Sequence, residues 1–351
     1  MTILVTLLGL PGCREKRETI FDRVVSIPKE LVLDVPYLPP LCDELSGLKK
    51  GFVDIPGGKL YYEEEGYGVP LVLINGGPGG THHGFHPYFS QLKDCARVIY
   101  YDQRGTGQSS MDPTGKYYTI RQAVEDLEYL RTHLKIDRWV VLGWSYGGLL
   151  AQCYALTYPE ACSGLILVAT ETGGIIQYRK REQPISELEW DAIASIRKVA
   201  QKGEITSVQC IYNTLLAGDW KSQYYFKPTR KTVIRQARYN WKPDEWGASS
   251  GFAQLMRPQV SKMNLKGKFD NFEIPTLIME AQYDMLLWQE VDRDITLRTN
   301  YSHAQLELFK QSGHTIFADE TDKFFAIVRT FLKKAGNSKI VYKPGHRIVF
   351  P

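Results

Sequence analysis

The chain has 351 residues, of which 43% are hydrophobic and 23% are charged, and its formal net charge is +4 at pH 7. This composition is typical of a globular protein, and the length allows one large α/β domain with an insertion or two modest domains. The mild charge, with no basic stripe, argues against a nucleic-acid partner. The six cysteines show neither a C-x-x-C pair nor a zinc-ligand spacing.

The first 48 residues are predicted to form an N-terminal extension. An apolar run over residues 2–10 ends in Leu10-Pro11-Gly12-Cys13, which resembles a bacterial lipobox with a signal over residues 1–13, although no lysine or arginine precedes it. The run is too short to span a bilayer. Two locations follow, either the cytoplasm or a membrane to which Cys13 anchors the protein as a lipoprotein. Membrane contact is expected only if Cys13 is lipidated.

Strands and helices alternate along the chain after residue 48. Residues 52–56 and 59–63 flank Gly57-Gly58, which predicts a hairpin with a two-residue loop. Thr119 and Gln122 are placed as a capping box at the start of a helix over 119–134. Further helices are predicted at 147–158 and 319–333, and apolar runs predict buried strands at 71–74, 97–101, 138–142, 164–169, 275–280 and 305–309.

This alternation predicts an α/β fold, with a mostly parallel sheet covered by helices on both faces. Residues 171–270 contain no buried-strand run and are rich in aromatic and charged residues, so we expect a helical cap inserted between two core strands. The core then comprises residues 49–170 and 271–335, and a basic tail over 336–351 has no predicted role. Ligands bind such sheets beyond the carboxyl ends of the strands.

The segment over residues 143–147, Gly-Trp-Ser-Tyr-Gly, fits the G-x-S-x-G nucleophile elbow. The motif requires a strand before it and a helix after it, and both are predicted here. Ser145 is therefore the candidate nucleophile.

A serine hydroxyl needs a base to take its proton and an acid to orient that base. His314 follows the strand at 305–309 and precedes the last core helix, so it is the candidate base. Asp284 follows the strand at 275–280 and is the candidate acid, with Glu280 as a competitor that lies within the strand. The order Ser145, Asp284, His314 is the one expected for this motif.

An oxyanion formed at the substrate carbonyl needs two backbone donors. We assign them to the N–H of Tyr146, the residue after the nucleophile, and the N–H of Gly77 in a glycine-rich loop. The segment over 102–109 is predicted to hold the strand-end loops in place. Residues 81–86, Thr-His-His-Gly-Phe-His, lack a helical i, i+4 carboxylate, so no metal site is expected there.

Three of these motifs occur together: GGPGG at 76–80, DQRGTGQS at 102–109 and GWSYGG at 143–148. In combination they resemble the prolyl aminopeptidase (proline iminopeptidase) family, which comprises serine peptidases of the α/β-hydrolase fold. The resemblance covers residues 51–170 and 275–332 and is weak in the cap. It implies release of an N-terminal residue, often proline, from peptides and a site that needs no cofactor.

The resemblance also bears on substrate binding. Family members bind the free amine with cap glutamates, and residues 243–246, Pro-Asp-Glu-Trp, are similar to such a stretch, so Glu245 receives this role. Trp144 and Tyr239 are the other predicted substrate contacts. The chain departs from the family at Asn75, where histidine is usual, and at Met285, where some members have a second glutamate.

Two other functions remain open. A general carboxylesterase or amide hydrolase would use the same Ser145, Asp284 and His314, and its substrate would be a small molecule rather than a peptide. A binding module that has lost its chemistry is the third reading. A serine at the elbow argues against epoxide hydrolases and haloalkane dehalogenases, which need an aspartate there.

Overall fold

The computed structural model describes residues 29–170, 185–241, 251–270, 272–284, 286, 301, 303–336, 348 and 350. In these residues eight strands form one sheet in the order β1-β2-β4-β3-β5-β6-β7-β8. The hairpin of β1 (Lys49–Ile55) and β2 (Gly58–Gly66) pairs antiparallel with β4. The other strands run parallel: β3 (Val69–Ile74), β4 (Ala96–Tyr101), β5 (Trp139–Trp144), β6 (Cys162–Val168), β7 (Thr276–Ala281) and β8 (Gln305–Phe309).

The central strands are buried on both faces, which explains why they are continuous apolar runs rather than alternating ones. Within β3, Val72 and Ile74 belong to the hydrophobic cluster on one face of the sheet, and Leu71 and Leu73 belong to the cluster on the other. The predicted α/β architecture is therefore confirmed.

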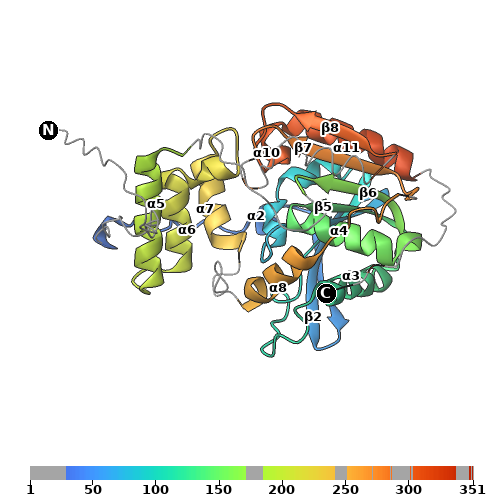
Figure 1. Cartoon of the computed structure of the whole chain (residues 1–351), viewed down its shortest axis with the longest axis horizontal. Helices are drawn as coiled ribbons and strands as arrows, with labels where there is room; N and C mark the ends of the chain where they lie inside the picture. Colours follow the sequence, from blue (N-terminus) through green and yellow to red (C-terminus); the bar gives the residue numbers. More distant parts are fainter. Residues whose placement is uncertain are drawn as a thin grey trace, which may run out of the picture.

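Helices cover both faces of this sheet (Figure 1). On one face lie α3 (Ile120–His133), α4 (Tyr146–Thr157) and α8 (Gly251–Lys262). On the other face lie α10 (Ile316–Asp319), α11 (Thr321–Gly336) and η3 (Tyr88–Leu92), which pack Phe317, Phe324 and Phe89 together. Short helices join the larger elements: η1 (Lys29–Leu31), α2 (Leu41–Glu44), η2 (His82–Gly84), η4 (Pro159–Ala161) and η5 (Asp219–Ser222).

The interval predicted as a cap contains two kinds of helix. The helices α5 (Glu187–Gln201), α6 (Ser207–Ala217) and α7 (Arg230–Tyr239) stand beside the sheet as a separate layer (Figure 1), and α6 and α7 share a small apolar core. In contrast, α8 packs on the core, where Phe252 contacts Tyr118 edge to face and Gln259 bonds the backbone of Tyr118 and Ile120.

The start of the described chain connects these two parts. Asn213 of α6 bonds both the N–H and the carbonyl of Leu33, and Arg235 of α7 bonds the Glu44 carboxylate. We call residues 33–44 the strap, because the segment runs from the cap helices to the beginning of β1. Much of the predicted extension lies before residue 29 and therefore outside the described residues, including Cys13.

Two local predictions differ from the structure. The hairpin loop is Pro56-Gly57 rather than Gly57-Gly58, because Gly58 already pairs with Ile55 and Gly57 takes the positive φ of 79°. The Thr119 side chain accepts from the Gln122 N–H as predicted, but the Gln122 amide donates to Asp126. Only the Thr119 half of the predicted capping box is therefore seen.

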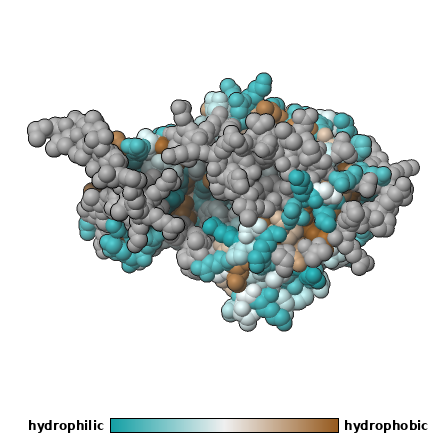
Figure 2. All heavy atoms as spheres, viewed as in Figure 1, coloured by the Kyte–Doolittle hydropathy of each residue, from teal (hydrophilic) through white to brown (hydrophobic). Residues whose placement is uncertain are grey.

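The surface formed by the described residues is mostly polar in the view of Figure 2, with apolar residues in small groups. Across the described part of the chain, we find no helix with the length and apolar character needed to cross a bilayer. Of the C-terminal tail, Ile348 and Phe350 are described, and both pack against the core.

Candidate active site

Ser145 stands at the junction of β5 and α4 with a strained backbone, φ 58° and ψ −128°. Positive φ is uncommon for a residue with a side chain and is stable only where the surroundings enforce it. Here β6 and the residues after it do so: the Ser145 N–H donates to the Val168 carbonyl at 2.9 Å, and the Thr170 hydroxyl donates to the Ser145 carbonyl at 2.6 Å.

The glycines of the elbow are required by close backbone contacts. A Cβ on Gly143 would lie 2.2 Å from the carbonyl oxygen of Gly147, and a Cβ on Gly147 would lie 2.1 Å from that of Ile74. Both contacts involve main-chain atoms, which cannot move aside as a side chain can. The G-x-S-x-G spacing is thus a steric requirement of this turn.

His314 and Asp284 are paired at the ends of two other strands. His314 Nδ1 and Asp284 Oδ2 are 2.9 Å apart, and the side chains are 4% and 1% exposed. The other carboxylate oxygen of Asp284 accepts from the Leu286 N–H at 3.0 Å. Since an ionised carboxylate only accepts, Nδ1 carries the proton and Nε2 of His314 is left with its lone pair.

The loop that carries His314 is anchored by contacts to the cap. The Asp319 carboxylate accepts from the N–H groups of Gly313, Tyr225 and Phe226, and burial raises the pKa of this carboxyl. The Thr315 N–H donates to the Gln223 carbonyl at 2.9 Å. The position of the imidazole therefore depends on cap residues as well as on the sheet.

The glycine-rich loop after β3 approaches Ser145 closely. A Cβ on Gly76 would lie 3.1 Å from Cβ of Ser145, and Gly77 has a φ of 130°. The Gly80 N–H donates to the Gly76 carbonyl, which folds the loop back on itself. Asn75, which stands where the family usually has histidine, donates through Nδ2 to the Tyr101 carbonyl at 2.8 Å and so ties this loop to the end of β4.

Tyr146 can serve the site only through its backbone. Its phenol lies in the core cluster beneath the elbow, and burial raises the pKa of this group well above its ordinary value. Its N–H is at the first position of α4, where helical N–H groups have no intrahelical partner and the helix dipole is positive.

One pocket between the sheet and the cap gathers four of the eight predicted site residues. Ser145, His314, Gly77 and Trp144 all line it, and the Trp144 indole N–H donates to the His314 carbonyl at 3.0 Å. Asp284 lies behind His314. The remaining lining residues come from the loop after β3, from the cap and from one position after β7: Asn75, Gly76, Gly80, Thr81, Gly84, Gln223, Gln236, Asn240, Trp241 and Leu286.

Two predicted substrate contacts are not seen in this pocket. Tyr239 does not line it: its hydroxyl donates to the Leu38 carbonyl of the strap, and its ring stacks on His83 with centroids 5.2 Å apart. Glu245 lies outside the described residues, as does Met285.

Sequence reasoning missed Trp241, Gln236 and Gln223, which form the cap wall of the pocket. Gln236 donates to the Gln223 amide oxygen at 2.7 Å, so the two side chains are held together. Trp241 could have been predicted as a pocket residue, because it lies just before the segment over 243–246, to which amine binding is assigned. The two glutamines could not, since polar residues on a cap helix are usually solvated.

The segment over 102–109 has the architectural contacts predicted for it. Asp102 accepts from the N–H groups of His82 and Gln108, both at 2.8 Å. Arg104 forms a bidentate pair with Asp126 of α3, at 2.8 and 2.9 Å. Both carboxylates are buried and paired, which is how charges are tolerated in a core.

A strained serine elbow on a parallel sheet, with a histidine and an aspartate at later strand ends, defines a class of hydrolases. A family model described as alpha/beta hydrolase fold matches residues 69–321, and the chain belongs to this family. Its relatives by sequence include proline iminopeptidases. That of Lactobacillus helveticus is 28% identical over 304 residues, which cover 81% of this chain and 97% of the relative.

Two further relatives agree with this. The proline iminopeptidase of Clostridium botulinum is 26% identical over 82% of this chain and 99% of its own length. The probable proline iminopeptidase of Leptolyngbya boryana is 42% identical, but only over 126 residues, which are 35% of this chain and 37% of that protein. The resemblance inferred from the three motifs is confirmed, because proline iminopeptidases are among the proteins to which the chain is similar over most of its length.

Solved structures show the fold more widely. An esterase from Exiguobacterium antarcticum matches with a TM-score of 0.63 and 22% identity, covering 81% of this chain and all of the esterase. A meta-cleavage product hydrolase from Pseudomonas fluorescens matches with a TM-score of 0.63 and 19% identity, covering 81% of this chain and 98% of that one. At such identities the likeness concerns the fold alone.

Proposed function

We propose that the protein is a serine aminopeptidase that releases an N-terminal residue, proline first among them, through an acyl-enzyme. The observation that carries this proposal is the hydrogen-bonded Asp284–His314 pair, whose histidine lines one pocket with the strained Ser145. The proline iminopeptidase relatives supply the substrate class.

In the proposed reaction, Ser145 Oγ attacks the carbonyl carbon of the first residue while Nε2 of His314 takes the hydroxyl proton. Asp284 accepts a hydrogen bond from Nδ1 of His314 and stabilises the imidazolium that forms. The N–H groups of Tyr146 and Gly77 receive the oxyanion. His314 then gives its proton to the departing amine, and a water molecule, deprotonated by the same histidine, releases the acyl group from Ser145.

Recognition of the free amine is the part of the proposal that rests on the cap. The described lining residues of the pocket include no carboxylate, only amides such as those of Gln223 and Asn240. Glu245 follows Trp241 by four residues, and we propose it as the carboxylate that pairs with the substrate ammonium. Such a pair discriminates against a blocked terminus because the buried carboxylate would then lack its partner.

The same absence of a described carboxylate favours a second candidate, a general carboxylesterase or amide hydrolase. Trp144 and Trp241 provide apolar walls that an acyl group can contact as well as a proline ring can. In that case the triad acts in the same way, and Glu245 has no part in binding.

A panel of aminoacyl arylamides, each with a free or an acetylated amine, tests the proposal. We expect the proline arylamide with a free amine to be cleaved fastest and the acetylated form to be cleaved poorly. Ser145→Ala should lower kcat by at least about 10⁴-fold, and Glu245→Ala should mainly raise KM. Equal turnover of free and acetylated substrates, with no effect of Glu245→Ala, would establish the esterase or amidase instead.

A further inference from the structure

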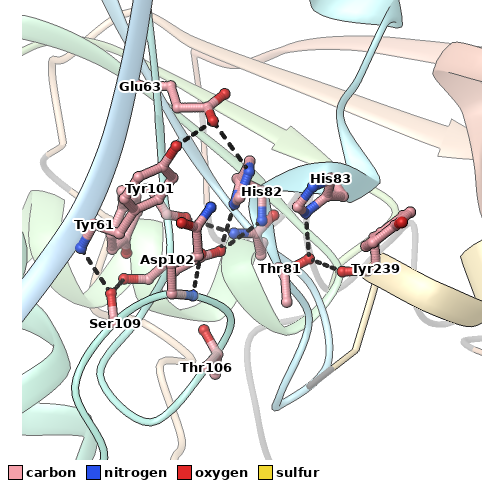
Figure 3. Close-up of polar contacts among 12 residues, drawn as sticks. Tyr61, Glu63, Thr81, His82, His83, Tyr101, Asp102, Thr106, Ser109 and Tyr239 are labelled. Carbon is pink, nitrogen blue, oxygen red and sulfur yellow. Dashed lines mark hydrogen bonds and ion pairs between the residues drawn. The ribbon is translucent and has the colours of Figure 1, made fainter. Parts of the chain in front are cut away.

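A second cluster of chemically capable side chains lies outside the pocket, and Figure 3 shows three of its members, Glu63, His82 and His83. Its members are Cys42 from α2, Glu63 from β2, and His82, His83 and His86 from the segment around η2. Cys42 is 3% exposed, and His82 and Glu63 are fully buried. The proposed hydrolysis uses none of them.

The orientation of His82 is fixed by Asp102 (Figure 3). Oδ1 of Asp102 lies 2.8 Å from the His82 backbone nitrogen and 2.9 Å from Nδ1. Because this carboxylate is an acceptor, Nδ1 carries a proton and Nε2 points the opposite way. Nε2 is buried and makes no hydrogen bond, and Oε1 of Glu63 lies 3.4 Å from it. A carboxylate that bonds one nitrogen of a histidine is the usual support for a metal on the other.

His83 is oriented by a similar argument. The Thr81 hydroxyl donates to the Tyr239 carbonyl at 2.5 Å, so its oxygen can only accept from His83 Nδ1, at 3.4 Å. The lone pair is therefore on Nε2 of His83, which lies 3.4 Å from Sγ of Cys42.

We propose that Sγ of Cys42, Nε2 of His82 and Nε2 of His83 bind a zinc ion. The three ligand atoms lie within 4.8 Å of one another. Bonds of about 2.3 Å to sulfur and about 2.0–2.1 Å to nitrogen place tetrahedral S and N ligands about 3.6 Å apart, close to the Cys42–His83 separation. This inference is independent of the proposed peptidase activity.

The ligand set determines which ion fits. One thiolate and two imidazoles are borderline-soft donors, which suit zinc, whereas magnesium and calcium require oxygen ligands. Glu63, His82 and His86 form a second group within 4.8 Å. There, however, Nε2 of His86 is already paired with Oε2 of Glu63 at 3.0 Å. We therefore assign the first group and leave the fourth position to water or to Glu63.

Charge is also compensated in this arrangement. His82 lies between two buried carboxylates, Asp102 and Glu63. A divalent ion bound to Nε2 of His82 and to the Cys42 thiolate adds positive charge beside both of them, and a buried anion is stable only when such charge lies close to it.

The ion would fasten the strap to the core. Cys42 belongs to the strap, and the two histidines follow the glycine-rich loop, between the pocket-lining residues Thr81 and Gly84. Sequence reasoning rejected a metal at residues 81–86 because it looked for a nearby third ligand. That ligand is Cys42, forty residues earlier, and only the fold brings it to His83.

Cobalt titration of the full-length chain, after treatment with a chelator, tests the site. We expect one Co²⁺ per chain, with the ligand-field bands of a tetrahedral site and a sulfur-to-cobalt charge-transfer band, and zinc should displace the cobalt. Cys42→Ser should remove the charge-transfer band, and His83→Gln should weaken binding at least about tenfold. Zinc should raise the Tm of the wild type but of neither variant.

Matched controls are available in the same chain. Cys95→Ser removes a partly exposed thiol that bonds the Leu92 carbonyl, and His133→Gln removes an exposed histidine on α3; both should bind cobalt as the wild type does. Circular dichroism reports whether each variant is folded, and the half-buried His83 provides a second test if Cys42→Ser is not. Absence of stoichiometric cobalt binding in the wild type, or a charge-transfer band that persists in Cys42→Ser, overturns the assignment and leaves an ionic network only.

Discussion

At the scale of single residues, the site depends on backbone positions that only a few side chains allow. Ser145 holds a φ of 58°, a conformation that costs about 1–3 kcal/mol in a residue with a side chain. Contacts with Val168 and Thr170 maintain it. The elbow is therefore sensitive to any atom that displaces these neighbours, even when the triad itself is unchanged.

Gly147→Ala should disrupt the elbow, because the new methyl group would lie 2.1 Å from the Ile74 carbonyl oxygen. We expect a loss of about 1–3 kcal/mol in the free energy of unfolding, as for an overpacked core, together with a large fall in kcat. Urea unfolding and arylamide kinetics measure the two effects. Gly251→Ala is the control, since a Cβ at Gly251 meets no atom within 4 Å. Equal behaviour of the two variants would contradict this account.

Asp284→Asn should lower kcat by about 10⁴-fold, because an amide can donate to Nδ1 and hold His314 in the wrong tautomer. Structural integrity should be retained, since the substitution changes no volume. Glu280→Gln, at the buried carboxylate within β7, should leave kcat within about tenfold of the wild type, since the carboxylate bonded to His314 remains. The kcat values of the two variants, measured with the same arylamide, test this expectation. A larger loss of kcat in Glu280→Gln than in Asp284→Asn would show that Glu280 is the acid.

At the scale of elements, the core strands were predictable, whereas the individual helices of the cap were not. The strand at 305–309 has the predicted bounds, and the other buried strands shift by at most two residues at an end, because continuous apolar runs in a parallel sheet leave a strong signal. Each of the two hairpin strands differs by three residues at one end. The hairpin loop moved by one residue, since two adjacent glycines do not say which one takes the positive φ. The helices α5 to α7 bury their apolar residues against one another. Their positions therefore could not be predicted from the strand pattern of the core.

The N-terminus of α5 gives a prediction about pH. The Glu189 side chain bonds Lys221 and the Ser186 backbone, and these contacts lower the pKa of this carboxyl from 4.5 to about 2. A folded-state pKa below the unfolded one stabilises the fold above pH 4.5, and this contribution is lost as the pH falls toward about 2.

Glu189→Gln should therefore have a lower Tm than the wild type at pH 6, and the difference should shrink across this window of pH. Calorimetry at several pH values measures it. Glu187→Gln, in the same first turn but exposed, serves as the control and should show a smaller difference. A constant gap between Glu189→Gln and the wild type from pH 6 to pH 2 would contradict the assigned ion pair.

At the scale of the whole molecule, the strap connects parts that lie far apart in the sequence. The Asn213 amide oxygen accepts from the Leu33 N–H at 3.0 Å, and its amide nitrogen donates to the Leu33 carbonyl at 2.9 Å. Arg238 bonds the carbonyls of Val35 and Pro36. Neither contact was predictable, because residues 14–48 offered only a proline-rich, charged composition.

Asn213→Ala should release the strap locally, since both backbone groups of Leu33 lose their partner. A typical hydrogen bond contributes about 0.5–1.5 kcal/mol net, so amide exchange at the half-exposed Leu33 should accelerate by about 2- to 12-fold. Hydrogen–deuterium exchange by mass spectrometry measures this. Gln209→Ala, which removes an exposed contact with Asp34, is the control. Unchanged exchange in Asn213→Ala would show that other contacts hold the strap.

The catalytic residues and the proposed zinc ligands also differ in whether they could be predicted from the sequence. Ser145, Asp284 and His314 were predictable because each follows a recognisable strand and a known motif order links them. The Cys42–His82–His83 group was not, because Cys42 in α2 lies far in the sequence from the two histidines in η2, and no motif links them.

The cap leaves the sheet after Val168 and returns at Thr276, yet Leu165 still pairs with Thr276 and Val168 with Met279. Adjacent parallel strands are thus in register regardless of what is inserted between them. An insert of different length or sequence is therefore compatible with the same register, so a change in selectivity need not disturb the catalytic strands. Where insert and core are bonded to each other, as the loop of His314 is to residues 223–226 and Thr81 is to Tyr239, the two parts must change together.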